Sequence, residues 1–232
     1  MVPTNSLQAL RGEEADRSAL LRLVRHEGGE VLRAYLTDLF VQGWVAVLHV
    51  RDLETSDHTH RVARATVALG RALGLDEWTL RIWRWGALLH DIGKVAVPDN
   101  ILHKPGPLTL QEWRVMRRHP LLAREILEKA SFVPPAVLEI PLCHHERWDG
   151  SGYPFGLQES TIPLSARAFA IVDVWDALQS ERPYRAPWPR ERVVRYLQAN
   201  AGGLFDPYLV DLYIRLVKRG GEVLVGADAR GV

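Results

Sequence analysis

Apolar residues recur at helical spacing through nearly the whole chain, and this periodicity limits the fold more than any other feature of the sequence. Leucine, isoleucine, valine, alanine and tryptophan return every three or four residues, which places them on one face of a helix. No convincing run alternates apolar and polar residues between hairpin turns, as a half-buried strand would. The sequence therefore predicts an all-α fold.

Glycine and proline divide this pattern into segments. Gly28 and Gly29 interrupt the first segment, and Gly74 is a C-terminal cap for the second. Thr109 and Glu112 have the spacing of a capping box at a helix start. A loop is expected before them, because VPDNILHKPGPL contains three prolines. The expected helical segments are residues 6–40, 41–73, 76–94, 109–119, 120–130, 134–143, 163–179, 189–200 and 206–218.

Composition excludes several classes of protein. The net charge is +1, so no strong general attraction to polymeric nucleic acid or to anionic lipid is expected. Cys143 is the only cysteine, which rules out an intramolecular disulfide. No 18-residue uncharged run appears, and the first residues carry acids and arginines where a secretory signal needs an apolar stretch. We expect a cytoplasmic protein with no membrane span.

The adjacent pair His90 and Asp91 is the first candidate for chemistry, with Lys94 one helical turn beyond His90. Taken alone, the pair is better explained by a core histidine next to a solvated acid, because two-residue motifs often occur by chance. The other histidines change that balance, because five of the nine fall where one bundle could aim them inward. These five are His58, His90, His119, His144 and His145.

Two carboxylates add to this set. Glu54 lies four residues before His58, on the same helical face, although an ordinary exposed pair has the same spacing. Asp173 lies among apolar residues in AFAIVDVWDAL, where an unpaired carboxylate would cost several kcal/mol. Asp176 is less compelling, since it could cap, pair or face solvent. Histidine and carboxylate ligands without cysteine favour iron, manganese or zinc.

Several motifs in order resemble the HD-GYP family, a branch of the HD metal-dependent phosphohydrolases. They are ETSDH, LLHDIGK, HKPGPLT, MRRHP, HHERWDGSGYP, IVDVWDAL and SERPYR. The resemblance spans roughly residues 40 to 216. It implies a helical HD-domain bundle over residues 41–232, preceded by a short N-terminal helical extension, residues 1–40. It also implies hydrolysis of cyclic di-GMP to pGpG, GMP or both, by a metal-bound hydroxide in a centre of two or three ions, with iron or manganese favoured.

The resemblance also assigns roles to single residues. Asp91 would bridge two ions, and Lys94 would lie near the scissile phosphate, so these two are the expected catalytic residues. Glu54 matches the acid of family members with a third ion. Arg185 departs mildly from the family, which more often has lysine there. The implied metal ligands are Glu54, His58, His90, Asp91, His119, His144, His145 and Asp173. The implied substrate contacts are Lys94, Gly152, Tyr153, Arg182 and Arg185.

Two other functions stay open at the level of sequence. The chain could be a catalytically weak module that binds cyclic di-GMP, or a diguanylate cyclase partner, through the GYP surface. It could also be an HD hydrolase of another cyclic dinucleotide, because these motifs do not reveal base recognition. Tyr153 has two readings of equal weight, namely substrate contact and simple packing at a loop. A homodimer formed through the N-terminal helices is a further option.

Overall fold

The computed structural model describes residues 29–51, 56–181 and 186–219, and its regular structure is helical. Among these residues there is no β-strand, only an isolated bridge between Ala201 and Phe205. The predicted all-α fold is confirmed. The elements are α2 (Gly29–Arg51), α3 (Ser56–Ala72), α4 (Glu77–Leu88), η1 (Ile92–Ala96), α5 (Asp99–Leu102), α6 (Leu110–Met116), α7 (His119–Leu127), η2 (Pro135–Leu138), α8 (Glu139–Cys143), η3 (Glu159–Thr161), α9 (Leu164–Gln179), α10 (Arg190–Ala199) and α11 (Pro207–Arg219).

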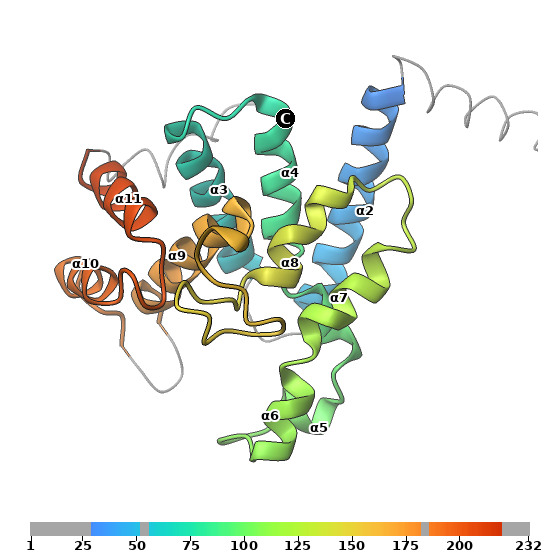
Figure 1. Cartoon of the computed structure of the whole chain (residues 1–232). Coiled ribbons are helices and arrows are strands. Elements are labelled where there is room, and N and C mark those ends of the chain that lie inside the picture. Colours follow the sequence, from blue (N-terminus) through green and yellow to red (C-terminus); the bar gives the residue numbers. More distant parts are fainter. Residues whose placement is uncertain (1–28, 52–55, 182–185, 220–232) are drawn as a thin grey trace, which may run out of the picture. The chain divides into compact units, whose positions relative to one another are not determined.

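Helices α3, α4, α8 and α9 form the centre of the fold (Figure 1), and each packs against at least two of the others. Each contributes a fully buried apolar side chain, namely Leu69, Trp85, Ile140 and Phe169. Burying one such side chain is worth roughly 1.5–3 kcal/mol. This packing fixes the ends of α4 and α8, where the histidine motifs lie.

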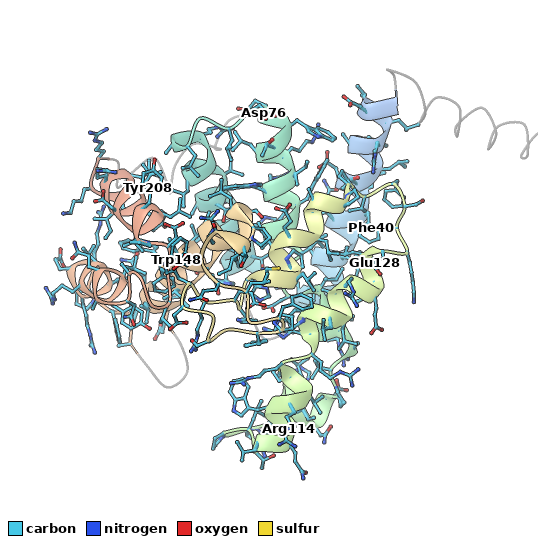
Figure 2. All side chains as sticks on the ribbon, viewed as in Figure 1. Phe40, Asp76, Arg114, Glu128, Trp148 and Tyr208 are labelled. Carbon is cyan, nitrogen blue, oxygen red and sulfur yellow. The ribbon has the colours of Figure 1, made fainter. Side chains whose placement is uncertain are left out.

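The remaining elements extend from this centre in two directions. Helices α10 and α11 pack on α9, and α11 also packs on α3, with Tyr213 fully buried in the contact. At the bottom of Figure 1, α5 and α6 form a projection that carries Arg114, labelled in Figure 2. The backbone N–H of Trp148, also labelled in Figure 2, donates to the carbonyl of Leu204 (3.2 Å) in the loop between α10 and α11.

Several helix ends fall where the sequence placed them. Asp76 caps α4 by accepting from the backbone N–H of Thr79 at 2.9 Å. The predicted capping box of Thr109 and Glu112 opens α6. Gly74 has a φ of +77° just after α3, a backbone conformation that favours glycine.

Other boundaries differ from the prediction. The pattern from 41 to 73 is two helices, because α2 ends at Arg51 and α3 begins at Ser56. The proline-rich segment at 97–108 contains the short helix α5. His119 begins α7 rather than closing α6, with Pro120 in the first turn, a position that tolerates proline.

The most consequential difference concerns His90 and Asp91, which the sequence placed inside a helix. Helix α4 ends at Leu88, and both residues lie in the turn that leads into η1. At Gly93, η1 approaches the start of α7 so closely that a Cβ atom would lie 1.8 Å from the carbonyl oxygen of His119. This long-range contact between two backbones is invisible to local periodicity.

The boundary between two compact units falls inside helix α2, at Phe40 and Val41. The assignment of residues 1–40 and 41–232 as extension and catalytic domain stays a prediction. Helix α2 is long and apolar enough to cross a membrane by length and composition alone, and 17% of its most apolar window is buried. One such helix is weak support for a span, so the expected absence of a membrane span and the cytoplasmic location also stay predictions.

Candidate metal centre

Seven of the predicted ligands converge from five places in the chain. His58 comes from α3, His90 and Asp91 from the turn after α4, His119 from the start of α7, His144 and His145 from the end of α8, and Asp173 from α9. Their ligand atoms form two groups, each within 4.8 Å. The members of the two groups are Asp91, His119, His144 and His145, and then His58, His90 and Asp173.

Asp91 stands where the two groups meet. One carboxylate oxygen, Oδ2, lies 3.0 Å from His90 Nε2 and 2.8 Å from Lys94 Nζ. The other oxygen, Oδ1, lies 3.3 Å from His119 Nε2 and 3.8 Å from His144 Nε2. This Oδ1 atom is buried and has no hydrogen-bond partner among the described residues. A buried carboxylate oxygen without a donor is costly, and a cation would satisfy it.

In three histidines the nitrogen that faces away from the cluster, Nδ1, carries the ring hydrogen, so His119 and His144 bring no donor to Asp91 Oδ1. His90 Nδ1 lies 2.8 Å from the Ala87 carbonyl oxygen and His119 Nδ1 lies 2.9 Å from that of Met116. His144 Nδ1 lies 3.1 Å from the carbonyl oxygens of both Ile140 and Pro141. A carbonyl only accepts, so each Nδ1 carries the hydrogen, and in the neutral ring Nε2 is left as a lone pair.

The inner nitrogens therefore face one another without hydrogens. His119 Nε2 and His144 Nε2 are 3.4 Å apart, which brings two lone pairs together beside a carboxylate oxygen. A proton or a metal ion between them removes the repulsion. Neutral imidazole with Nδ1–H bound to a carbonyl is the usual form of a metal-ligating histidine. The residues present thus fit a metal site.

The second group is centred on His58. His58 Nε2 lies 3.3 Å from Asp173 Oδ1, and the rings of His58 and His90 are 5.9 Å apart and nearly perpendicular. The Asp173 side chain keeps 28% of its surface exposed. Asp173 is therefore only partly buried, whereas His58 and His90 of the same group are buried.

Burial controls the protonation of the histidines. It lowers the pKa of His119, lowers that of His144 to about 3 and lowers that of His145 well below its usual value. Burial opposes a charged His90 as well, but the attraction of Asp91 outweighs it and leaves the pKa of His90 raised. Burial also opposes ionisation of Asp91, but Lys94 and His90 together hold its pKa well below its usual value. Neutral His119, His144 and His145 next to the ionised Asp91 are ready to bind metal near neutral pH.

The GYP turn lies against this cluster. The ring of Tyr153 stacks on that of His145, with centroids 4.6 Å apart and an interplanar angle of 22°. The guanidinium of Arg117 lies 5.2 Å from the centroid of the same tyrosine ring. At Gly152 a Cβ atom would lie 2.4 Å from the backbone nitrogen of Arg147. Only glycine therefore lets the turn pass this close to the HHER segment.

Glu146 anchors that turn, and sequence reasoning did not single it out. Its buried carboxylate accepts from the backbone N–H groups of Phe155 (2.7 Å) and Leu157 (3.0 Å). Nothing in the local pattern distinguishes an inward glutamate here from an exposed one. Its position directly after two predicted ligands was the available signal.

Arg61 was missed as a member of the site, and of the options left open for Asp176, to cap, pair or face solvent, the structure shows pairing. The Nδ1–H of His58 donates to Asp176 Oδ2 at 2.7 Å, and Arg61 binds both oxygens of the same carboxylate. Burial raises the pKa of Asp176, but these bonds outweigh burial and lower it. The signal was helical spacing, since Asp176 follows Asp173 by three residues and Arg61 follows His58 by three.

Three predicted residues fall outside the described part of the chain. They are Glu54, Arg182 and Arg185. Their predicted roles stay predictions.

Comparison with known proteins identifies the family. A model of the HD domain family matches residues 47–209. The chain belongs to the HD domain family. The cyclic di-GMP phosphodiesterase response regulator RpfG of Xanthomonas campestris pv. campestris is 45% identical to this HD domain over 170 residues, which are 72% of the chain and 45% of that protein. The resemblance to the HD-GYP branch is thereby confirmed.

A second relative is named for a different substrate. The 3′3′-cGAMP-specific phosphodiesterase 2 of Vibrio cholerae is 44% identical over 168 residues, 72% of this HD domain and 32% of that protein. The chain thus spans less than half the length of these two relatives. Among solved structures, an HDG"Y"P protein of Bdellovibrio bacteriovorus has the same fold, with a TM-score of 0.59 at 18% identity over 86% of this chain and 68% of that one.

Proposed function

We propose that this HD domain is a metal-dependent phosphodiesterase that hydrolyses cyclic di-GMP to pGpG, GMP or both. The observation that carries the proposal is the convergence of inward-facing imidazole nitrogens on the unpartnered Oδ1 atom of Asp91. The 45% identity to a protein named as a cyclic di-GMP phosphodiesterase supports the same reaction.

The two ligand groups support a centre of at least two ions, with Asp91 contributing to both. Iron or manganese suits this ligand set of histidine and carboxylate. A third ion would need Glu54. When bound, such ions supply positive charge to phosphoryl oxygens and lower the pKa of a coordinated water.

The protein's own residues would bind and orient the phosphate. Lys94 Nζ, 2.8 Å from Asp91 Oδ2, is placed to offset charge that builds on a phosphoryl oxygen in the transition state. Tyr153, held on His145 by the anchored GYP turn, would border the substrate and orient it. Gly152 lets that turn approach, and Arg182 and Arg185 would contact substrate phosphates. No side-chain nucleophile is required.

Another cyclic dinucleotide is the second candidate substrate, and a specific observation favours it. A relative named for 3′3′-cGAMP is 44% identical, about as similar as the relative named for cyclic di-GMP. Both substrates contain a ring closed by two phosphodiester linkages, and Lys94 would act on one of these linkages. The difference between them lies in one base, which the metal centre does not read.

A catalytically silent module is the alternative from another class, acting through cyclic di-GMP or a diguanylate cyclase at the GYP surface. The seven described ligand candidates are all present and assembled, which favours the enzyme. We also propose, as separate possibilities, a diguanylate cyclase as a protein partner and a homodimer of this chain. Light scattering after size-exclusion chromatography tests the homodimer.

Turnover by the purified chain tests the main proposal. Protein prepared without chelator is loaded with Mn²⁺ or Fe²⁺ under reducing conditions and given cyclic di-GMP, 3′3′-cGAMP or cyclic di-AMP at equal concentration. We expect cyclic di-GMP to yield pGpG or GMP, Asp91→Ala to abolish this, and Asp211→Asn, an exposed change on α11, to leave it intact. Metal-loaded protein that cleaves none of the three overturns the proposal, and cleavage of 3′3′-cGAMP alone moves the assignment to the second candidate.

A further inference from the structure

His58 differs from the other three histidines whose outer nitrogen has a described partner. His90, His119 and His144 each have Nδ1 next to a backbone carbonyl, which no substitution removes. His58 Nδ1 instead donates to a side chain, the carboxylate of Asp176, at 2.7 Å. The orientation of His58 therefore depends on residues that can be changed singly.

Asp176 is itself held from several sides. Arg61 Nε donates to Oδ1 at 2.6 Å, and Arg61 Nη2 donates to Oδ2 at 2.8 Å. The hydroxyl of Ser180 donates to Oδ2 at 3.2 Å. This two-bond contact with a planar guanidinium fixes the plane of the carboxylate. All the contacts on both oxygens from the described residues come from donors, so this position suits a group that only accepts.

We propose that Asp176, fixed by Arg61, is a positioning residue that keeps the hydrogen of His58 on Nδ1 and thereby presents Nε2 as a ligand to the ion held with His90 and Asp173. The inference rests on the proposed function only in requiring a metal centre. Its effect is confined to one of the two ligand groups, because His119 and His144 of the other group are oriented by backbone carbonyls.

An asparagine in place of Asp176 has the same shape but cannot satisfy these partners. Its amide has one accepting oxygen and one donating nitrogen. If the nitrogen faces Arg61 Nε, two donors meet at the 2.6 Å contact. If the nitrogen faces His58, it donates to Nδ1 and drives the ring hydrogen to Nε2, the atom that would bind metal. Either arrangement weakens the site, the second by selecting the wrong tautomer.

Metal titration of folded variants tests this directly. Metal-free protein is titrated anaerobically with Mn²⁺, and free Mn²⁺ is followed by electron paramagnetic resonance. For the wild type we expect at least two equivalents to bind. For Asp176→Asn we expect one equivalent to weaken by about 10–100-fold while another keeps the wild-type Kd. His58→Ala is the reference for loss of that ligand.

The chain offers a matched control. Asp211 and Arg215 form an Asp–Arg pair on α11, with 2.8 Å between Oδ2 and Nη1, and both side chains are more than half exposed. Asp211→Asn makes the same chemical change away from the centre and should bind as the wild type does. Arg61→Gln, at a side chain that is 37% exposed, keeps the Asp176 carboxylate and should weaken the same equivalent less, so it decides the matter if Asp176→Asn does not fold.

Three results would overturn the inference. One is a folded Asp176→Asn, or Arg61→Gln in its place, that binds every equivalent as Asp211→Asn does. Another is equal weakening of all equivalents, which indicates a general structural role. The last is a wild type that binds no Mn²⁺. Because no nucleotide enters the titration, a wild type that binds metal without hydrolysing cyclic di-GMP contradicts only the proposed function.

Discussion

At the scale of single residues, Lys94 is the cation closest to the expected site of reaction among the described contacts of Asp91. Its ammonium contacts Asp91 Oδ2 at 2.8 Å and helps to keep that carboxylate ionised. Lys94→Met removes a positive charge from the place where phosphoryl charge builds. We expect kcat for the cyclic dinucleotide to fall by about 10²–10³, measured as initial rates at saturating substrate with bound metal quantified in parallel.

The control for Lys94 is Lys129→Met, at an exposed position after α7. It should leave kcat unchanged. A Lys94→Met enzyme that retains full kcat contradicts the assigned role. The assigned role is also contradicted if the loss of activity in Lys94→Met is fully explained by a loss of bound metal.

Gly152 tests how tightly the GYP turn must approach the HHER segment. In Gly152→Ala the new methyl group would lie 2.4–2.7 Å from backbone atoms of Glu146 and Arg147, and backbone cannot yield as a flexible side chain can. We expect a loss of roughly 1–3 kcal/mol in the free energy of unfolding, measured by urea denaturation, together with weaker substrate binding. Gly203→Ala, where the Cβ would meet one atom at 3.8 Å, should cost far less, and equal costs would refute the argument.

The sequence identified residues through motif and spacing, and it missed those that act through a partner. Asp173 stands out because its carboxylate interrupts an apolar helical pattern, whereas His58 and His119 stand out through the motifs ETSDH and MRRHP. Asp176 carried the same spacing signal, but its partners come from α3, more than a hundred residues earlier in the chain. Sequence spacing names candidate ligands, whereas the groups that orient them depend on which helices pack together.

At the scale of elements, the same limit explains the turn after α4. The apolar pattern continues through LLHDIGK, and so it predicted one helix to residue 94. The chain instead leaves the helix at Leu88, and Gly93 brings η1 onto α7. That departure lets His90 and Asp91, which point about 100° apart on a regular helix, both reach the centre.

The α6 capping box gives an element-scale prediction with a defined pH dependence. A hydrogen bond from Lys104, followed by one from the Thr109 backbone, lowers the pKa of Glu112 to about 2. The carboxylate therefore stabilises the fold above its unfolded pKa of about 4.5, and this stabilisation is lost as pH falls toward 2. We expect Glu112→Gln to melt below the wild type at pH 7 and the difference to shrink between pH 4.5 and pH 2.5, measured by circular dichroism.

A matched substitution for Glu112→Gln is Glu77→Gln. Glu77 makes an exposed 3.5 Å contact with Arg71, so its removal should change the melting temperature little at either pH. If the Glu112→Gln difference instead grows on acidification, the sign of the argument is wrong.

At the scale of the whole molecule, the metal centre is made where α3, α4, α7, α8 and α9 meet, so binding and folding are linked. The all-α class followed from periodicity alone. The division of the ligands into two groups did not, because it depends on the angles between helices that sequence periodicity leaves open. Metal binding should therefore stabilise the assembled fold, since the unfolded chain has no preformed site.

This linkage predicts how the stability of metal-free protein depends on pH. The pKa values of His119, His144 and His145 are lowered in the folded protein. Below about pH 6.5, these histidines therefore bind more protons in the unfolded chain than in the folded chain. Each such histidine removes up to ~1.4 kcal/mol per pH unit as the pH falls from 6.5 toward its folded value. The raised pKa of His90 opposes this only in part. Chelated protein should melt at a lower temperature at pH 5 than at pH 7.5.

Added metal should stabilise the folded protein most strongly near neutral pH, where the imidazoles are neutral and free to bind. At a Mn²⁺ concentration of about 100 times Kd, each site should add ~2.7 kcal/mol, and the gain in melting temperature should shrink at pH 5 because protons compete for the same nitrogens. Mg²⁺ at equal concentration controls for ionic strength, since it prefers oxygen ligands. Thermal melts of one chelated preparation with each ion at both pH values measure the effect. Equal stabilisation by the two ions, or a larger Mn²⁺ effect at pH 5, would show that the buried histidines do not bind metal.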